Sequence, residues 1–146
     1  MRKFLFSIFC FLCCFPLFAQ DSDSVKYQSL EPYDFHLQYL RADSALLIDV
    51  REFFEYRKSR IHGALFMPPS GGFDIAADTI DKNWSLFCYC YNGGRSVRAL
   101  LFFYDKGFRK LYNLEGGIIA WKRDGFPADK SRIRKRARGR EGARGR

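Results

Sequence analysis

The residues of this chain that have the types and spacing for chemistry lie together at 90–96, where they read Cys-Tyr-Asn-Gly-Gly-Arg-Ser. An apolar run at 86–89 leads directly into Cys90. Apolar residues then recur at helical spacing, at Val97, Leu100, Leu101 and Tyr104. This pattern predicts a buried strand that ends at Cys90, a tight loop containing two glycines, and the first turn of a helix.

A cysteine in that position is expected to be a nucleophile. The first turn of a helix has unpaired N–H groups and a partial positive charge, which stabilise a nearby anion. Cysteine pKa values of about 8.5 fall to roughly 3.5–7.5 in such places. Gly93 and Gly94 allow positive φ angles, so that backbone amides can point inward. Arg95 adds a fixed positive charge for an anionic substrate. A cysteine that only filled the core would need neither the glycines nor the arginine.

The overall charge does not indicate a nucleic-acid-binding protein. The chain has 146 residues, enough for one domain with a core, and a formal net charge of +9. Residues 130–146 carry +8 of that charge and residues 1–19 carry +2, which leaves −1 for residues 20–129. The part predicted to fold is therefore nearly neutral, and we expect no specific nucleic-acid partner.

The two ends of the chain differ from the middle in composition. Arg2 and Lys3 precede an apolar run at 4–18, and the small residue Ala19 follows it. This is the pattern of a secretory signal peptide, and the run is shorter than the ~20 residues of a spanning helix. We expect a signal peptide at 1–19, export to the periplasm or outside the cell, and a polar linker at 20–30. An uncleaved anchor is the alternative.

The C-terminal segment at 130–146 consists almost entirely of Arg, Lys, Gly and Ala. Such a composition cannot supply a core, so it predicts a disordered tail. Its charge makes it a candidate contact to an anionic polymer or lipid surface, although a tail that is merely solvated is the simpler interpretation.

The middle of the chain, residues 31–129, is predicted to be one α/β domain. Helical patterns occur at 31–42, 52–58, 73–80, 96–105 and 118–123. Short apolar runs typical of strands occur at 46–50, 61–67, 84–90 and 110–114. Alternating strands and helices predict a parallel sheet with helices on both faces. Ligands bind such sheets beyond the carboxyl ends of the strands, where Cys90 is expected.

Five stretches of the chain form a recognisable set: 47–52 (Leu-Ile-Asp-Val-Arg-Glu), 61–64 (Ile-His-Gly-Ala), the 90–96 loop, 107–108 (Gly-Phe) with 112–114 (Tyr-Asn-Leu), and 115–121 (Glu-Gly-Gly-Ile-Ile-Ala-Trp). Together and in this order, they resemble the rhodanese-like sulfurtransferase family over about residues 28–128. One departure is Arg60, which stands where the family often has a histidine. We therefore expect His36 and His62 to be surface or packing residues.

The resemblance implies a double-displacement reaction. The Cys90 thiolate would take the outer sulfur of a small anionic donor such as thiosulfate, and the resulting persulfide would pass it to cyanide or a thiol, which a protein could carry. The resemblance also implies that residues Tyr91, Asn92, Gly93, Gly94, Arg95 and Ser96 bind the substrate. No metal or other cofactor is needed if the thiolate is already formed. Asp49 and Arg51, at the end of a neighbouring strand, are expected to support the loop as an ion pair.

Two other functions remain open on the sequence alone. Some phosphatases and arsenate reductases of similar fold use a cysteine and an arginine separated by five residues, whereas four separate Cys90 from Arg95. The shorter loop should fit a sulfur atom better than a phosphate. Rhodanese-like modules also serve as non-catalytic binding domains, but these often lack the loop cysteine.

Cys88 is expected to be an inert core residue. It lies two positions before Cys90, so both side chains should leave the same face of the strand. Their Cα atoms would be about 6.5–7 Å apart, near the upper limit for a disulfide. We therefore predict that the two thiols remain unlinked and that the pKa of Cys88 is normal or raised.

Overall fold

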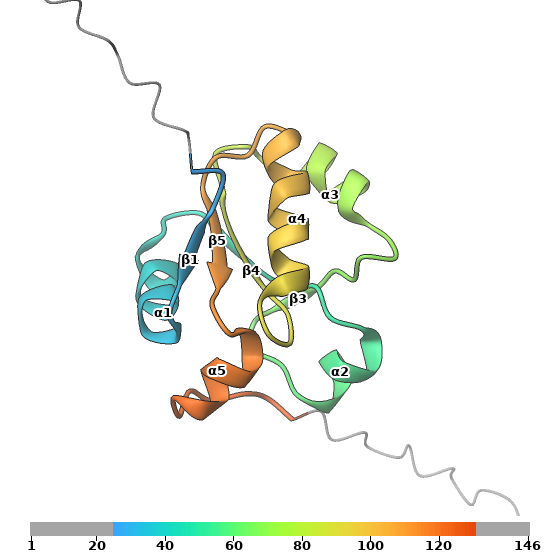
Figure 1. The fold of residues 1–146 in the computed structure, drawn as a ribbon. Coiled ribbons are helices and arrows are strands. Elements are labelled where there is room, and N and C mark those ends of the chain that lie inside the picture. Colours follow the sequence, from blue (N-terminus) through green and yellow to red (C-terminus); the bar gives the residue numbers. More distant parts are fainter. Residues whose placement is uncertain (1–24, 131–146) are drawn as a thin grey trace, which may run out of the picture.

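Residues 25–130 are described by the computed structural model (Figure 1). The predicted signal peptide and the predicted tail after residue 130 lie outside the described residues. Five strands form the sheet: β1 (Gln28–Leu30), β2 (Ala45–Asp49), β3 (Leu65–Phe66), β4 (Ser85–Tyr89) and β5 (Leu111–Leu114). Five helices follow them in strict alternation: α1 (Pro32–Arg41), α2 (Phe53–Lys58), α3 (Phe73–Thr79), α4 (Gly94–Asp105) and α5 (Gly117–Arg123).

The strand order places β4 in the middle of the sheet. The order is β1-β5-β4-β2-β3, and every neighbouring pair is parallel. All five residues of β4 are buried, as expected for a strand covered on both faces. Because β4 ends at Tyr89, Cys90 emerges at the centre of the carboxyl edge of the sheet.

Side chains of β4 alternate between two cores. Cys88 packs with residues of α3 and α4, including Ala77 and Phe103. Phe87 and Tyr89 pack with residues of α1 and α5. Helices α3 and α4 therefore cover one face of the sheet and α1 and α5 the other, while α2 lies at the end where the strands finish (Figure 1). The predicted fold class, a parallel α/β sheet with helices on both faces, is confirmed.

The structure corrects the expected linker at 20–30. Gln28–Leu30 forms strand β1, in parallel pairing with β5, and the Leu30 carbonyl accepts a hydrogen bond from the Glu115 amide over 2.9 Å. Leu30 also packs against the core shared by α1 and α5. The segment has too few apolar residues for its sequence to predict a strand. Backbone pairing at the sheet edge holds it in place.

The expected strand at 61–67 shortens to Leu65–Phe66. The Ile61 amide donates to the Tyr89 hydroxyl over 3.1 Å rather than to a neighbouring strand. Gly63 then turns the chain at a φ of 76°. The apolar residues Ile61 and Ala64 are buried because they pack into the core, although they do not belong to a strand.

Within residues 25–130, no helix combines the length and the apolar character needed to cross a membrane.

Candidate active site

Cys90 lies in a loop that is held from behind by helix α5. The Ile118 amide donates to the Cys90 carbonyl over 2.9 Å, and the Ile119 amide donates to the Tyr91 carbonyl over 3.3 Å. With these carbonyls bound on one side, the loop turns an amide toward the thiol on the other. Gly93, at a φ of 98°, makes this turn possible and forms the N-cap of α4.

The sulfur of Cys90 accepts hydrogen bonds from two residues of the loop. The Gly93 amide lies 3.1 Å from Sγ and the Ser96 hydroxyl 3.6 Å from it. Burial raises the pKa of Cys90. Hydrogen bonds from the Ser96 hydroxyl and from the amides of Ser96, Asn92 and Gly93 lower it by more, so the net pKa is below the ordinary value. The predicted activation of this thiol by the start of α4 therefore has a geometric basis.

The remaining loop residues take different positions. The Asn92 side-chain oxygen lies 4.0 Å from Sγ and accepts a hydrogen bond from the Gly94 amide over 3.4 Å. Gly94 thus bonds to Asn92 and not to the sulfur. The Tyr91 side chain is exposed at the rim of the site. Cys90 itself is buried at the base of the loop.

Asn113 completes the support of the thiol from strand β5. The Ser96 hydroxyl, whose one proton is donated to one acceptor at a time, lies 2.7 Å from Asn113 Oδ1 and 3.6 Å from the Cys90 sulfur. The Asn113 Nδ2 group donates to the Ser29 hydroxyl over 2.9 Å. Asn113 therefore ties Ser96 to the edge strand β1. Asn113 was not among the site residues predicted from the sequence. Its place at the end of β5, beside the end of β4, is the signal that points to it.

The positive charge of Arg95 is already paired. Its guanidinium donates to both oxygens of Glu55 on α2, over 2.8 and 2.9 Å. Hydrogen bonding to Glu55 is the largest cause that raises the pKa of Arg95, and the nearby Cys90 thiolate raises it as well. Arg95 was predicted to supply a charge for an anionic substrate, but it is paired with Glu55, a residue 40 positions earlier that was not predicted to belong to the site.

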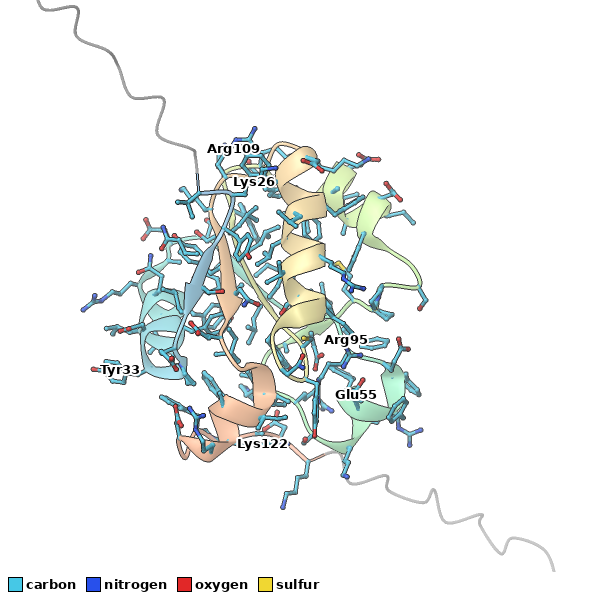
Figure 2. All side chains as sticks on the ribbon, viewed as in Figure 1. Lys26, Tyr33, Glu55, Arg95, Arg109 and Lys122 are labelled. Atoms are coloured by element: carbon cyan, nitrogen blue, oxygen red, sulfur yellow. The ribbon has the colours of Figure 1, made fainter. Side chains whose placement is uncertain are left out.

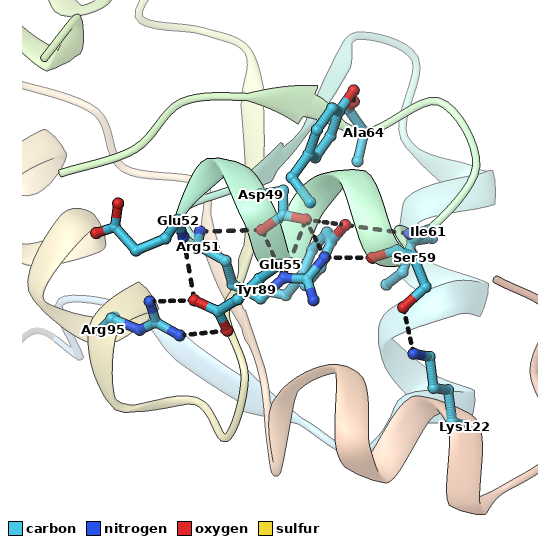
Figure 3. A network of polar contacts seen from close by, with 11 residues as sticks. Asp49, Arg51, Glu52, Glu55, Ser59, Ile61, Ala64, Tyr89, Arg95 and Lys122 are labelled. Atoms are coloured by element: carbon cyan, nitrogen blue, oxygen red, sulfur yellow. Dashed lines mark hydrogen bonds and ion pairs between the residues drawn. The ribbon is translucent and has the colours of Figure 1, made fainter. Parts of the chain in front are cut away.

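Asp49 and Arg51 form the expected ion pair, in full burial. The guanidinium of Arg51 lies 2.6 Å from Asp49 Oδ2 and also donates to the Ser59 carbonyl over 2.6 Å. The Tyr89 hydroxyl donates to Asp49 Oδ2 over 2.7 Å. This network fastens the ends of β2 and β4 to the connection after α2, as Figure 3 shows. The pair supports the surroundings of the Cys90 loop and makes no hydrogen bond to its sulfur.

A cavity of about 610 Å³ lies beside the loop, between α2, α5 and the start of α4. Tyr91 and Arg95 line it from the loop, Phe54 and Lys58 from α2, and Ile119 and Lys122 from α5. Arg95, Glu55 and Lys122 lie at the same end of the molecule in Figure 2, opposite Lys26 and Arg109.

Within residues 25–130, no group of three or more His, Cys, Asp or Glu side chains is placed to hold a metal ion.

The two histidines lie away from the thiol. His62 is exposed and its Nδ1 lies 2.9 Å from Asp129 Oδ2. His36 packs edge-on against Trp121 and Phe126. Both therefore occupy the surface and packing roles expected of them.

Comparison with known proteins agrees with this fold. The family model for the rhodanese-like domain matches residues 34–124. A sulfurtransferase of Allochromatium vinosum is 35% identical over 85 residues, which are 58% of this chain and 78% of that protein. The thiosulfate sulfurtransferase GlpE of Pseudomonas paraeruginosa is 33% identical over 92 residues, 63% of this chain and 82% of its own. The rhodanese-like domain of the Alr3790 protein from Anabaena is 29% identical with a TM-score of 0.54, covering 64% of this chain and 96% of that one.

The chain belongs to the rhodanese-like domain family, and sulfurtransferases are among its relatives. The relatives also include an enzyme with another name. A tRNA uridine(34) hydroxylase of Yersinia pestis is 28% identical over 116 residues, but only 32% of that protein is covered. What this chain does within the family therefore has to be argued from its own site.

Proposed function

We propose that this protein is a sulfurtransferase that moves a sulfane sulfur from a donor such as thiosulfate to a thiol or to cyanide, through a persulfide on Cys90. The observation that carries the proposal is the Gly93 amide directed at the Cys90 sulfur, together with the lowered pKa of that thiol. An amide so placed stabilises an anion, and both the thiolate and the persulfide are anions.

The first half-reaction loads the sulfur. The Cys90 thiolate attacks the outer sulfur of thiosulfate, the S–S bond of the donor breaks, and sulfite leaves with the electron pair. In the second half-reaction an acceptor thiolate or cyanide attacks the outer sulfur of the persulfide, and Cys90 leaves as the thiolate. Neither half-reaction needs a metal or a redox partner, because the sulfur moves between nucleophiles. The Gly93 amide and the Ser96 hydroxyl, which lie 3.1 and 3.6 Å from Sγ, are placed to stabilise negative charge there in both.

A mass spectrum of the intact protein before and after exposure to thiosulfate tests the proposal. We expect the protein to gain one sulfur atom at Cys90, and to lose it again on addition of cyanide with release of thiocyanate. A Cys90→Ser variant is the control and should gain nothing. Failure of the unmodified protein to take up sulfur would favour a non-catalytic binding module.

Phosphatase or arsenate reductase activity is the second candidate, and one observation speaks against it. The loop between Cys90 and Arg95 has only four residues, and its Gly94 amide is directed at the Asn92 side chain and not at the Cys90 sulfur. A tetrahedral oxyanion needs several amides directed into the same cradle. Hydrolysis of an aryl phosphate by the purified protein, lost in Cys90→Ser, would support this alternative.

Export and the tail remain parts of the proposal. The basic and apolar pattern at 1–19 supports export to the periplasm or beyond, and the mass of the mature protein would reveal the cleavage site. The charge of +8 at 130–146 supports contact with an anionic surface. Deletion of the tail should remove salt-sensitive binding to anionic vesicles while sulfur transfer continues.

A further inference from the structure

The cavity beside the Cys90 loop, which Tyr91 and Arg95 line, is larger than the small substrates named above require. Its volume is about 610 Å³, within the ~300–1,000 Å³ typical of sites that enclose organic ligands. Thiosulfate and cyanide have only a few heavy atoms each, so neither would fill it. The shape of the site therefore leaves room for a substrate with an organic body attached to its sulfur.

The walls of this cavity suit an apolar body. Phe54 is 73% exposed, Tyr91 52% and Ile119 43%, and all three side chains line the same hollow. A single exposed apolar residue is ordinary on a protein surface, but three around one cavity form a contact surface. They come from α2, from the Cys90 loop and from α5, so the cavity is apolar on three sides of the approach to the loop.

The same cavity carries positive charge without a matching carboxylate. Glu55 is bound by Arg95, and Asp49 is bound by Arg51. Lys58 and Lys122 also line the cavity, and within residues 25–130 neither forms an ion pair with a carboxylate. The ammonium group of Lys122 donates to the Ser59 hydroxyl, as Figure 3 shows. Burial and the neighbouring cations Arg51, Lys58 and Lys130 lower the pKa of Lys122, as expected where positive charges gather.

We propose that the sulfur acceptor of this protein is an organic thiol with an apolar chain and a terminal carboxylate, which binds with the chain against Phe54 and Ile119 and the carboxylate at Lys58 and Lys122. This inference rests on the proposed sulfur transfer through Cys90 and names the class of its acceptor. The acceptor thiol loses its proton to solvent, and its thiolate attacks the outer sulfur of the Cys90 persulfide. The S–S bond of the persulfide breaks, Cys90 leaves as the thiolate, and the acceptor departs as an organic persulfide.

Three acceptors separate the contributions of chain and charge. The full-length protein is loaded with sulfur from thiosulfate, freed of excess donor, and mixed with mercaptohexanoate, mercaptohexanol or mercaptoethanol. The rate of sulfur loss from Cys90 is followed by intact mass. We expect mercaptohexanoate to be about fivefold faster than mercaptohexanol, the effect of one exposed ion pair, and this advantage to shrink at high salt. Mercaptohexanol should in turn be faster than mercaptoethanol, because its longer chain buries more apolar surface.

Matched lysine variants locate the carboxylate. In Lys122→Gln and Lys58→Gln the advantage of mercaptohexanoate over mercaptohexanol should fall toward one. Lys110→Gln is the control, because Lys110 lines a separate hollow at the opposite end of the strands. Equal rates for the two longer thiols in the unmodified protein would overturn the inference and leave the proposed function intact. If thiosulfate leaves no sulfur on Cys90, the proposed function fails, and this inference with it.

Discussion

Arg95 at the start of α4 and Glu55 in α2 are joined by two hydrogen bonds of 2.8 and 2.9 Å, and this pairing holds a cation beside the Cys90 thiol. Glu55 also accepts a hydrogen bond from the Glu52 amide, over 3.1 Å, and so caps α2. One carboxylate thus fixes both the helix that walls the cavity and the arginine closest to the sulfur. An anionic donor has to compete with Glu55 for Arg95.

Glu55→Gln should therefore increase the rate of loading from thiosulfate. The glutamine can still accept the hydrogen bond from the Glu52 amide, but it no longer neutralises Arg95. We expect kcat/KM for thiosulfate to rise about fivefold, the size expected for one partly exposed ion pair. Glu52→Gln is the matched control, since it alters the same helix end and leaves the pair with Arg95 in place. A rate in Glu55→Gln equal to or below that of the unmodified protein would show that the pair does not limit donor binding.

The two cysteines should behave differently despite lying two residues apart. Both are free thiols in the structure. Burial raises the pKa of Cys88, so Cys88 remains a protonated thiol at neutral pH. We expect Cys90→Ser to abolish sulfur transfer and Cys88→Ser to retain most of it. Iodoacetamide at pH 6 should label Cys90, and Cys88 only after unfolding. An intramolecular disulfide between them in the native protein would contradict this assignment.

The pH dependence of Cys90 alkylation should report the hydrogen bond from Ser96. Because the folded site lowers the pKa of this thiol, the thiolate forms below the ordinary value, and the alkylation rate should rise with pH through that lowered midpoint. The Cys90 thiolate stabilises the folded protein at pH values above the pKa that Cys90 has in the unfolded chain. This contribution is lost as the pH falls through the lower pKa of Cys90 in the folded protein. Ser96→Ala removes one stabilising donor, so the midpoint should move upward.

A control separates this effect from a general loosening of the loop. Ser85→Ala changes a buried serine at the opposite end of β4, away from the sulfur. It should leave the midpoint of the alkylation profile where it is in the unmodified protein. A Ser96→Ala midpoint that stays in place, or moves downward, would rule out the Ser96 hydroxyl as a stabiliser of the thiolate.

The parts of this site that follow each other in the chain could be predicted from the sequence, and those that come from elsewhere could not. The strand, the glycines and the helix around Cys90 are contiguous, so local rules place the thiol at a helix start. Glu55 and Asn113 reach the loop only through the order of strands in the sheet. Nothing in the residues near Glu55 distinguishes it from a solvent-exposed helix charge. Strand β1 was missed for a similar reason, because pairing with β5 and not its own composition holds it.

The contact between α5 and the back of the Cys90 loop should depend on Gly117. Its φ is +59°, and a Cβ at this position would lie 2.5 Å from the Tyr91 carbonyl oxygen and 2.6 Å from the Cys90 carbonyl oxygen. Both are backbone atoms, and both oxygens already accept hydrogen bonds from the start of α5. They cannot move without breaking those bonds and turning the loop away from the sulfur.

Gly117→Ala should accordingly lower the free energy of unfolding by about 2–5 kcal/mol, from the left-handed backbone and the overpacking together. Gly63→Ala is the matched control, since Gly63 also has a positive φ, of +76°, but a Cβ there would meet nothing within 4 Å. Gly63→Ala should lower the free energy of unfolding only by the cost of the left-handed backbone, about 1–2 kcal/mol.

Urea unfolding measures the stability of both variants, and the pH profile of Cys90 alkylation then shows whether the loop has changed. We expect the midpoint to rise in Gly117→Ala and stay constant in Gly63→Ala, because only Gly117 touches the carbonyls whose fixed direction leaves the Gly93 amide facing the thiol. Equal losses of stability and equal midpoints in the two variants would show that α5 does not hold the loop in its active shape.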